Sequence, residues 1–386
     1  MFRIGFVLGA SLIALPASAQ DLKLTKPSAR LGHQFSSILG LRELSDGRVV
    51  VADGIDNVVV RVNLTTQKMD TLGRSGAGPG EYKAPDVILP LPGDGFLLVD
   101  LGNARISIFD GAGKYRESVP IAQGSPGGGP GGGGMSLIIP RASDGSGRIY
   151  YQPMGGGRGA DSAVVIRWDR GASKFDTVAR VKLPTMVVRS SGGPNNQRQT
   201  QRPPPYPVQE SWTVAPDGRV ALIRAPAYRV DWVSGVGTRV SGKPIEAPPV
   251  AVRDAEKREY LAELAANGLS VEMENDNGRV SMRFSRGRGR DPDADDAPDL
   301  GGQEWPASKP ITTGSVTTDP AGRAWVERAV AAGAARVYDV IGPDGGVSIR
   351  VTLPVGRRLV GVGLKGLYAR HVDSDGINYL ERYDIQ

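Results

Sequence analysis

One short pattern recurs along this chain, and it constrains the fold more than any other feature. Its clearest copy runs from Pro92 to Tyr115 and contains a turn, the apolar run Phe96–Val99, a second turn at 100–103 and the alternating run Ile106–Phe109. The first run is too short for a helix, and the second alternates as a half-buried strand does. Asp, Gly and Asn in the second turn tolerate left-handed backbone or bond their own main chain. The pattern is therefore typical of a β-hairpin.

A glycine turn before a short strand marks six copies of this pattern. The turn glycines are Gly47, Gly95, Gly147, Gly218, Gly322 and Gly366. Successive positions differ by 48, 52, 71, 104 and 44 residues, and three of these intervals lie near the blade periods of roughly 40 to 50 residues. Four-stranded blades around an axis bury each apolar face against the neighbouring blades. We therefore predict an all-β fold, a six-bladed β-propeller formed by residues 20–386 as one domain.

The chain ends and the longest interval carry further predictions. The last copy runs out of chain at Gln386, so we expect an N-terminal strand near Leu22–Leu24 to close the last blade. An insertion at about 251–305 separates blades four and five. Apolar residues at helical spacing in 251–267 predict a helix there, because they recur among charged residues and end before a glycine.

Other inserted segments have little apolar content. We expect two strands after the predicted helix, at Leu269–Met273 and Arg279–Phe284. Segments rich in Gly, Pro or charged residues cannot bury enough apolar surface to order themselves. On that ground we predict mobile loops at Gly124–Gly134 and Arg189–Pro207, and disorder at Ser285–Gly302.

The first nineteen residues have the layout of a secretory signal peptide. Arg3 precedes the apolar run Ile4–Pro16, and Ala17–Ala19 supplies the small residues of a cleavage site. We expect cleavage after Ala19 and a periplasmic or secreted location. The apolar run is shorter than the roughly 20 residues that a membrane span needs, and no later stretch is apolar enough to cross a bilayer.

Composition excludes several kinds of site. The chain has no cysteine, so disulfides, thiolate metal sites and a thiol nucleophile are ruled out. The formal charge is +6, but the arginines are scattered through turns and loops. Without a basic helical face or a stacking aromatic motif, we expect no nucleic-acid partner.

Two stretches resemble a known family. Val99–Asp110 resembles the core of an NHL repeat, and Gly76–Tyr82 resembles the connector of bacterial six-bladed propellers in the TolB-like superfamily. The resemblance implies the propeller fold, which hosts binding modules, scaffolds and several enzymes. A phosphate-binding interpretation of Gly76–Glu81 is disfavoured, because the loop lacks the Gly-Lys-Ser/Thr ending and no helix pattern follows it.

Carboxylate and amide side chains recur at one point of the first two copies. These candidate metal ligands are Asp53 with Asn57, and Asp100 with Asn103. Corresponding turns of a propeller lie on one rim, so these groups can converge on a hard cation such as Ca²⁺. The resemblance implies the same use, since lactonase-like relatives place acidic and amide side chains in the central channel. The alternative is that the four residues cap tight turns, and it is favoured because the other blades supply no matching partners.

The sequence predicts a binding or scaffolding module rather than an enzyme. We expect a monomer without a cofactor that binds a protein, peptide or glycan at the loop face or channel mouth. The alternative is a divalent-metal-dependent hydrolase or lactonase that uses the candidate ligands. His33 and His371 are the only histidines, and nothing in the sequence near them completes a catalytic triad, so no catalytic residue is assigned.

Overall fold

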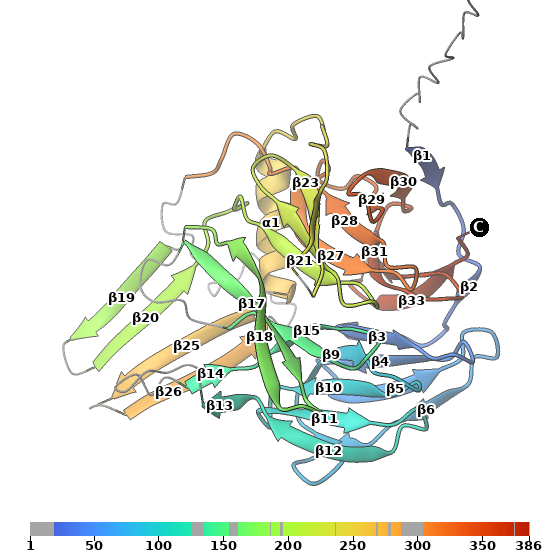
Figure 1. The fold of residues 1–386 in the computed structure, drawn as a ribbon, viewed down its shortest axis with the longest axis vertical. Coiled ribbons are helices and arrows are strands. Elements are labelled where there is room, and N and C mark those ends of the chain that lie inside the picture. The colour runs from blue at the N-terminus through green and yellow to red at the C-terminus, as the bar shows by residue number, and fades with distance from the viewer. Residues whose placement is uncertain are drawn as a thin grey trace, which may run out of the picture.

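The protein is a six-bladed β-propeller (Figure 1). The computed structural model describes residues 19–124, 135–153, 161–185, 187–193, 196–235, 237–267, 269–276, 279–286, 304–373 and 375–385. Within each blade, antiparallel strands follow one another in sequence order from the inner to the outer edge. Each copy of the predicted repeat therefore corresponds to one blade.

The first three blades have four strands each. Blade one contains β3 (Gly40–Glu43), β4 (Val49–Asp53), β5 (Val58–Val62) and β6 (Met69–Thr71). Blade two contains β9 (Pro85–Pro90), β10 (Phe96–Asp100), β11 (Arg105–Phe109) and β12 (Tyr115–Pro120). Blade three contains β15 (Pro140–Ser143), β16 (Ile149–Tyr151), β17 (Ser162–Asp169) and β18 (Lys174–Lys182).

The last three blades repeat this order. Blade four contains β21 (Ser211–Val214), β22 (Val220–Arg224), β23 (Arg229–Val233) and β24 (Arg239–Ser241). Blade five contains β27 (Thr312–Thr318), β28 (Ala324–Arg328), β29 (Val337–Ile341) and β30 (Val347–Thr352). Blade six contains β31 (Arg357–Val362), β32 (Leu367–Val372) and β33 (Asn378–Tyr383).

Apolar clusters between neighbouring blades hold the ring together. The described core residues form six clusters, and each joins two adjacent blades. The second strand of a blade is buried on both faces, as in β4 and β10, because a neighbouring blade covers each side. Trp212, Trp232 and Trp325 lie in three of these clusters, so their rings fill blade interfaces.

Two N-terminal strands attach to different blades. The strand β1 (Gln20–Lys23) pairs in parallel with β30, so Leu22 lies opposite Val351 in blade five. The strand β2 (Ala29–Arg30) pairs with β33 and forms the outer strand of blade six. The expectation that Leu22–Leu24 completes blade six is therefore wrong, because Ala29–Arg30 forms that outer strand instead. The segment around Leu22 pairs with the free edge of β30 in blade five, and the chain then continues to blade six.

The insertion contains a helix and part of an extra sheet. The helix α1 (Asp254–Asn267) follows blade four, as the periodicity predicts. The strands β25 (Leu269–Asp276) and β26 (Arg279–Arg286) pair as a hairpin close to the predicted positions. They join β19 (Val187–Gly193) and β20 (Asn196–Arg202) in one four-stranded sheet.

The extra sheet corrects one prediction and leaves two others outside the described residues. Arg189–Pro207 is not a loop throughout, because most of it forms the β19–β20 hairpin and β20 pairs with β25. The polar composition of this segment does not by itself favour an ordered structure, but β20 gains backbone hydrogen bonds to β25 of the later insertion. Most of Gly124–Gly134 and of Ser285–Gly302 lies outside the described residues, as do residues 1–18 of the expected signal peptide.

Two small pairings complete the described strands. The strands β7 (Arg74–Ser75) and β8 (Glu81–Tyr82) pair in parallel within the connector between blades one and two. The strands β13 (Ala122–Gly124) and β14 (Met135–Leu137) pair between blades two and three. In the part of the chain that the structure describes, no helix has the length and apolarity of a membrane span.

Candidate functional site

The two predicted carboxylates occupy the same position in their blades. Asp53 and Asp100 are the last residues of β4 and β10 and are fully buried. The Asp53 carboxylate accepts hydrogen bonds from the backbone N–H groups of Ser36 at 2.8 Å and Ser37 at 3.1 Å. The Asp100 carboxylate accepts them from Lys83 and Ala84, each at 3.1 Å. Each carboxylate therefore fastens the end of its strand to the segment that leads into the first strand of the same blade.

The turns after these strands supply further donors. Oδ1 of Asp53 also accepts hydrogen bonds from the N–H groups of Ile55 and Asp56, and Oδ2 of Asp100 accepts one from Nδ2 of Asn103 at 2.6 Å. Asn57 adopts φ 54°, a left-handed conformation that asparagine tolerates better than most residues. The structure thus places all four candidate residues in two equivalent turns, where hydrogen bonds surround the carboxylates.

These four residues do not fit a calcium ion in this arrangement. Calcium takes six to eight oxygen ligands, whereas N–H donors already approach the carboxylates of Asp53 and Asp100. Asp53 and Asp100 are the fifth residues of their strands, and the fifth residue of the second strand is Arg224 in blade four, Arg328 in blade five and His371 in blade six, where the strand continues to Val372. Within the described ranges, no three acidic or histidine side chains are grouped as a metal site.

The glycine-rich connector is bound to blade two. Nδ2 of Asn103 donates to the carbonyl of Gly76, and Nη2 of Arg105 donates to the carbonyls of Gly78 and Glu81. The Tyr82 hydroxyl donates to Leu72 and accepts from the N–H group of Val59, which ties the connector to blade one. These contacts use the connector's carbonyl oxygens, which supports a structural role rather than anion binding.

The two histidines have separate surroundings. His33 packs edge-on against Phe35, with ring centroids 4.7 Å apart. His371 lies with Nδ1 3.5 Å from the carboxylate of Glu381, and burial lowers its pKa together with the nearby Arg357 charge. Glu381 is bound by Arg357 and Tyr383, so its carboxylate belongs to the packing of blade six.

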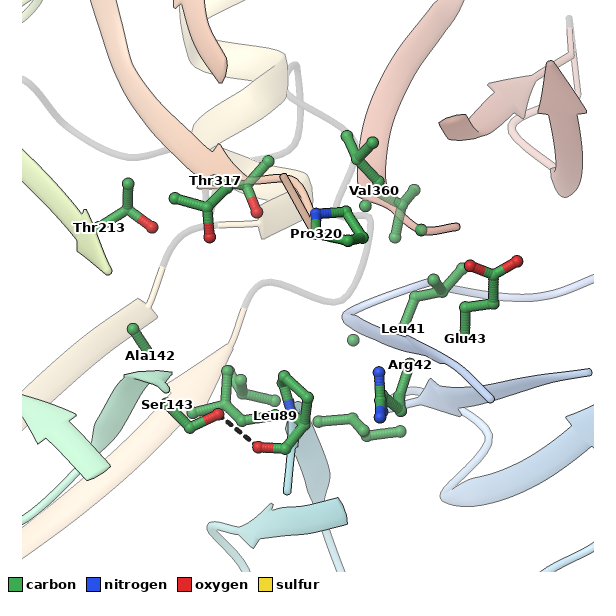
Figure 2. A pocket seen from close by; sticks show the side chains of 18 of the residues that line it. Leu41, Arg42, Glu43, Leu89, Ala142, Ser143, Thr213, Thr317, Pro320 and Val360 are labelled. Carbon is green, nitrogen blue, oxygen red and sulfur yellow. Dashed lines mark hydrogen bonds between the residues drawn. The ribbon is translucent and has the colours of Figure 1, made fainter. Parts of the chain in front are cut away.

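A cavity of about 500 Å³ lies on the propeller axis. The first strands of all six blades line it (Figure 2). Its wall includes apolar side chains such as Leu41, Leu89 and Val360, and hydroxyl groups such as Thr213 and Thr317. A volume of this size lies in the usual range for small-ligand sites.

Most polar groups in the wall already bind neighbouring blades. The Ser143 hydroxyl donates to the carbonyl of Pro90, and the Thr318 hydroxyl donates to that of Val214. Glu43 accepts hydrogen bonds from the Tyr368 hydroxyl at 2.8 Å and from the N–H group of Lys365. These bonds explain how hydroxyl and acidic residues fit at the crowded centre of the ring.

Two arginines also line the cavity. Nη2 of Arg42 lies 3.8 Å from the carboxylate of Asp94. Arg141 has no hydrogen bond or ion pair with the described residues, and its Cζ lies 5.4 Å from the centroid of the Trp212 ring. Arg141 is exposed to the cavity, but the surrounding wall displaces much of its water, and this desolvation lowers the pKa of its guanidinium. Desolvation also lowers the pKa of Arg42, although nearby Asp94 and Glu43 oppose this.

Reasoning from the sequence missed Arg141. The sequence contains a signal that could have identified it. Arg141 lies three residues before Asp144, where the turn between the first two strands begins, and the corresponding residue is apolar in each of the other five copies. Those residues are Leu41, Ile88, Trp212, Val316 and Val360. A single charged residue in such a set marks a position that packing alone does not explain.

Comparisons with known proteins find similarity only among solved structures. No protein-family model and no curated protein matches the chain. Among solved structures, it is similar to a calcium-binding protein, regucalcin, from Agrobacterium tumefaciens, with 12% identity, a TM-score of 0.41 and coverage of 95% of this chain and 98% of that one. A gluconolactonase from Xanthomonas campestris has 12% identity and a TM-score of 0.41, with coverage of 96% and 99%. A putative exported protein from Bacteroides fragilis has 10% identity and a TM-score of 0.43, with coverage of 95% and 99%.

Proposed function

We propose that this protein is an exported binding module that holds a segment of a protein, peptide or glycan in its central channel. The observation that carries this proposal is the cavity of about 500 Å³ formed by the first strands of all six blades. Such a volume accommodates a chain end or a few sugar units, whereas a folded domain is limited to the rim. The mixture of apolar and hydroxyl groups in its wall is typical of ligand sites.

The fold also supports a role as a rigid support for binding. Six apolar clusters connect the blades into a closed ring, so the wall of the channel is fixed by packing. A preorganised wall lowers the entropy that a ligand loses on binding. Loops on such a scaffold vary without disturbing the core, which suits recognition at the channel mouth.

Filling the channel tests the proposal. Thr317 is partly exposed in the wall of the cavity, so an indole ring at this position in Thr317→Trp occupies ligand space (Figure 2). Thr238→Trp makes the same change at an exposed turn of blade four that does not line the cavity. We expect Thr317→Trp to lose binding on a peptide and glycan array, and Thr238→Trp to keep it.

Two results would contradict this proposal. If wild type binds nothing on the array, or if folded Thr317→Trp binds as wild type does, the channel is not the binding site. Thermal melting of each variant shows whether it is folded. Calcium-dependent turnover of lactone or ester substrates would instead favour the hydrolase alternative, whose candidate ligands are engaged by N–H donors in this structure.

A further inference from the structure

Backbone geometry exposes Arg141 to the channel. Along the first strand of blade three, Pro140 pairs with Tyr151 and Ala142 pairs with Tyr150, so Arg141 is an extra, unpaired residue. A β-bulge of this kind turns the side chain away from the regular alternation of a strand. Val360 is the extra residue at the same position of blade six, and Figure 2 shows it at the cavity wall. The bulge thus places Arg141 on the channel surface, where it is exposed.

The surroundings of Arg141 leave its donors unused. Nothing acidic among the described residues pairs with it, and its guanidinium lies over the Trp212 ring. The two acidic residues of the cavity wall are occupied elsewhere. Asp94 accepts hydrogen bonds from Ser45 and faces Arg42, and Glu43 accepts them from blade six.

A second arginine strengthens the positive charge of this part of the wall. Arg42 comes from blade one and Arg141 from blade three, on either side of blade two. Nε of Arg42 is buried without a hydrogen-bond partner, even though its Nη2 faces Asp94. Buried donors are usually satisfied, so an unfilled one beside a cavity indicates room for an acceptor.

We propose that Arg141 is an anion-recognition residue that binds a carboxylate of the ligand in the channel. This inference rests on the proposed function and names the chemical class of the ligand. A guanidinium presents a planar fork of donors that matches the two oxygens of a carboxylate. The Trp212 ring beside it holds the fork by a cation–π contact and adds an apolar surface for the part of the ligand next to the carboxylate.

The test uses two pairs of probes that differ only in charge. One pair is an N-acetylated tripeptide with a free C-terminal carboxylate and its C-terminal amide. The other pair is trigalacturonic acid and its methyl ester. Isothermal titration of the wild-type protein is expected to show tighter binding of the acid in at least one pair. The pair that shows it distinguishes a peptide end from an acidic sugar.

Arg141→Met removes the charge and keeps an unbranched apolar stem. Because hydrogen bonds to charged groups are worth more than neutral ones, we expect it to weaken binding of the preferred acid roughly 10- to 100-fold. Arg141→Lys is expected to recover part of the loss, since it keeps the charge without the fork. Arg219→Met is the matched control, because Arg219 also lies over a tryptophan, with its Cζ 4.9 Å from the Trp232 ring centroid. Arg219 is bound to Asp217 and does not line the cavity, so its replacement should leave acid binding unchanged.

Three outcomes would overturn the inference. In the first, the wild-type protein binds neither acid. In the second, it binds the acid and the neutral form of each pair equally. In the third, Arg141→Met binds the acid as wild type does. The array test separates this inference from the proposed function. If one of these three outcomes is found but Thr317→Trp still abolishes binding on the array, the channel remains the binding site and only the carboxylate recognition is wrong.

Discussion

Blades one and two differ from blades four to six in how they bury charge. In the first two blades, the second strand ends in Asp53 or Asp100, and the carboxylate binds backbone N–H groups. In the last three, the same position holds an arginine or a histidine, and an acidic residue lies on the third strand instead. The basic and acidic partners are Arg224 with Asp231, Arg328 with Asp339, and His371 with Glu381.

Strand pairing shows that the acidic residues have also changed place. Asp231 lies opposite Leu222, and Asp339 lies opposite Val326. The residues at this position of the third strand are Val60 in blade one and Ser107 in blade two, which are uncharged. The buried carboxylates compared here therefore come from the second strand in blades one and two and from the third strand in blades four to six. Blade five also buries Glu327 on its second strand.

This difference shows that the blades share their apolar packing, whereas the charged residues at equivalent positions differ from blade to blade. A ring of carboxylates for a metal would need acidic residues at one position in several blades, and this position is acidic in only two of the blades compared here. Backbone N–H groups and arginine side chains both satisfy a buried carboxylate. Blade two contains an ion pair as well, since Nε of Arg105 lies 3.6 Å from the Asp100 carboxylate, but backbone N–H groups also bind that carboxylate.

The largest effect is expected from breaking an arginine-bound carboxylate. Asp339 is fully buried, and it accepts hydrogen bonds from Nε of Arg350 at 2.9 Å and from the Tyr228 hydroxyl. Asp339→Asn leaves the nearby Arg328 without a counter-charge among the described residues, and it leaves Arg350 only the exposed Asp21, 3.9 Å from its Nη1. Loss of one partner of a buried pair typically costs about 3–5 kcal/mol. Urea unfolding should show a loss of this size, and a loss below about 1 kcal/mol would contradict the importance of the pair.

A smaller effect is expected in the first group of blades. Asp100→Asn keeps the size of the side chain and one acceptor oxygen, but it weakens the bonds to Lys83 and Ala84. We expect a loss of about 1–3 kcal/mol in the free energy of unfolding, since Arg105, whose Nε lies 3.6 Å from this carboxylate, also donates to carbonyl oxygens of the connector. Asp53→Asn is the matched variant in blade one and should behave alike. If both variants lose as much as Asp339→Asn, the contrast between the two groups of blades fails.

The smallest effect is a dependence on pH in blade four. Burial raises the pKa of Asp231, but hydrogen bonds from Arg224, Arg239 and Arg229 outweigh this, and the pKa is lowered overall. A lowered pKa in the folded state stabilises the protein above the unfolded-state value of about 3.9, and this stabilisation is lost as the pH falls below it. The stability difference between wild type and Asp231→Asn should therefore be constant from pH 7 to about 5 and shrink below about 4. A difference that grows on acidification would contradict the arginine-bound arrangement.

Much of the architecture could be predicted from the sequence. The turn glycines and the alternating strands specify local hairpins, and their spacing specifies six copies. The strand residues of β10 and β11 are those that the pattern indicates, because burial between blades requires apolar residues there. The helix α1 was likewise visible, since its apolar residues recur at helical spacing.

The candidate site was less predictable. Asp53 and Asp100 could be recognised as equivalent, but their partners are N–H groups of residues 16 or 17 positions earlier, which no side-chain motif records. Arg141 faces the channel because of a bulge, and a bulge depends on the register of two strands. The hairpin β19–β20 is mostly polar, and pairing with a segment more than seventy residues away supplies its sheet neighbour.

By itself, the sequence determined the repeat, the number of blades and the kinds of residue at their interfaces, because these depend on local turn chemistry and on apolar periodicity. Tertiary structure decided where the two N-terminal strands attach, how each buried carboxylate is satisfied and which arginine of the channel has no acidic partner among the described residues. Those outcomes depend on contacts between segments that are distant in sequence, and their register is set only when the ring closes. The recurring hairpin thus identifies the scaffold, and the closed ring places Arg141 where an anionic ligand can reach it.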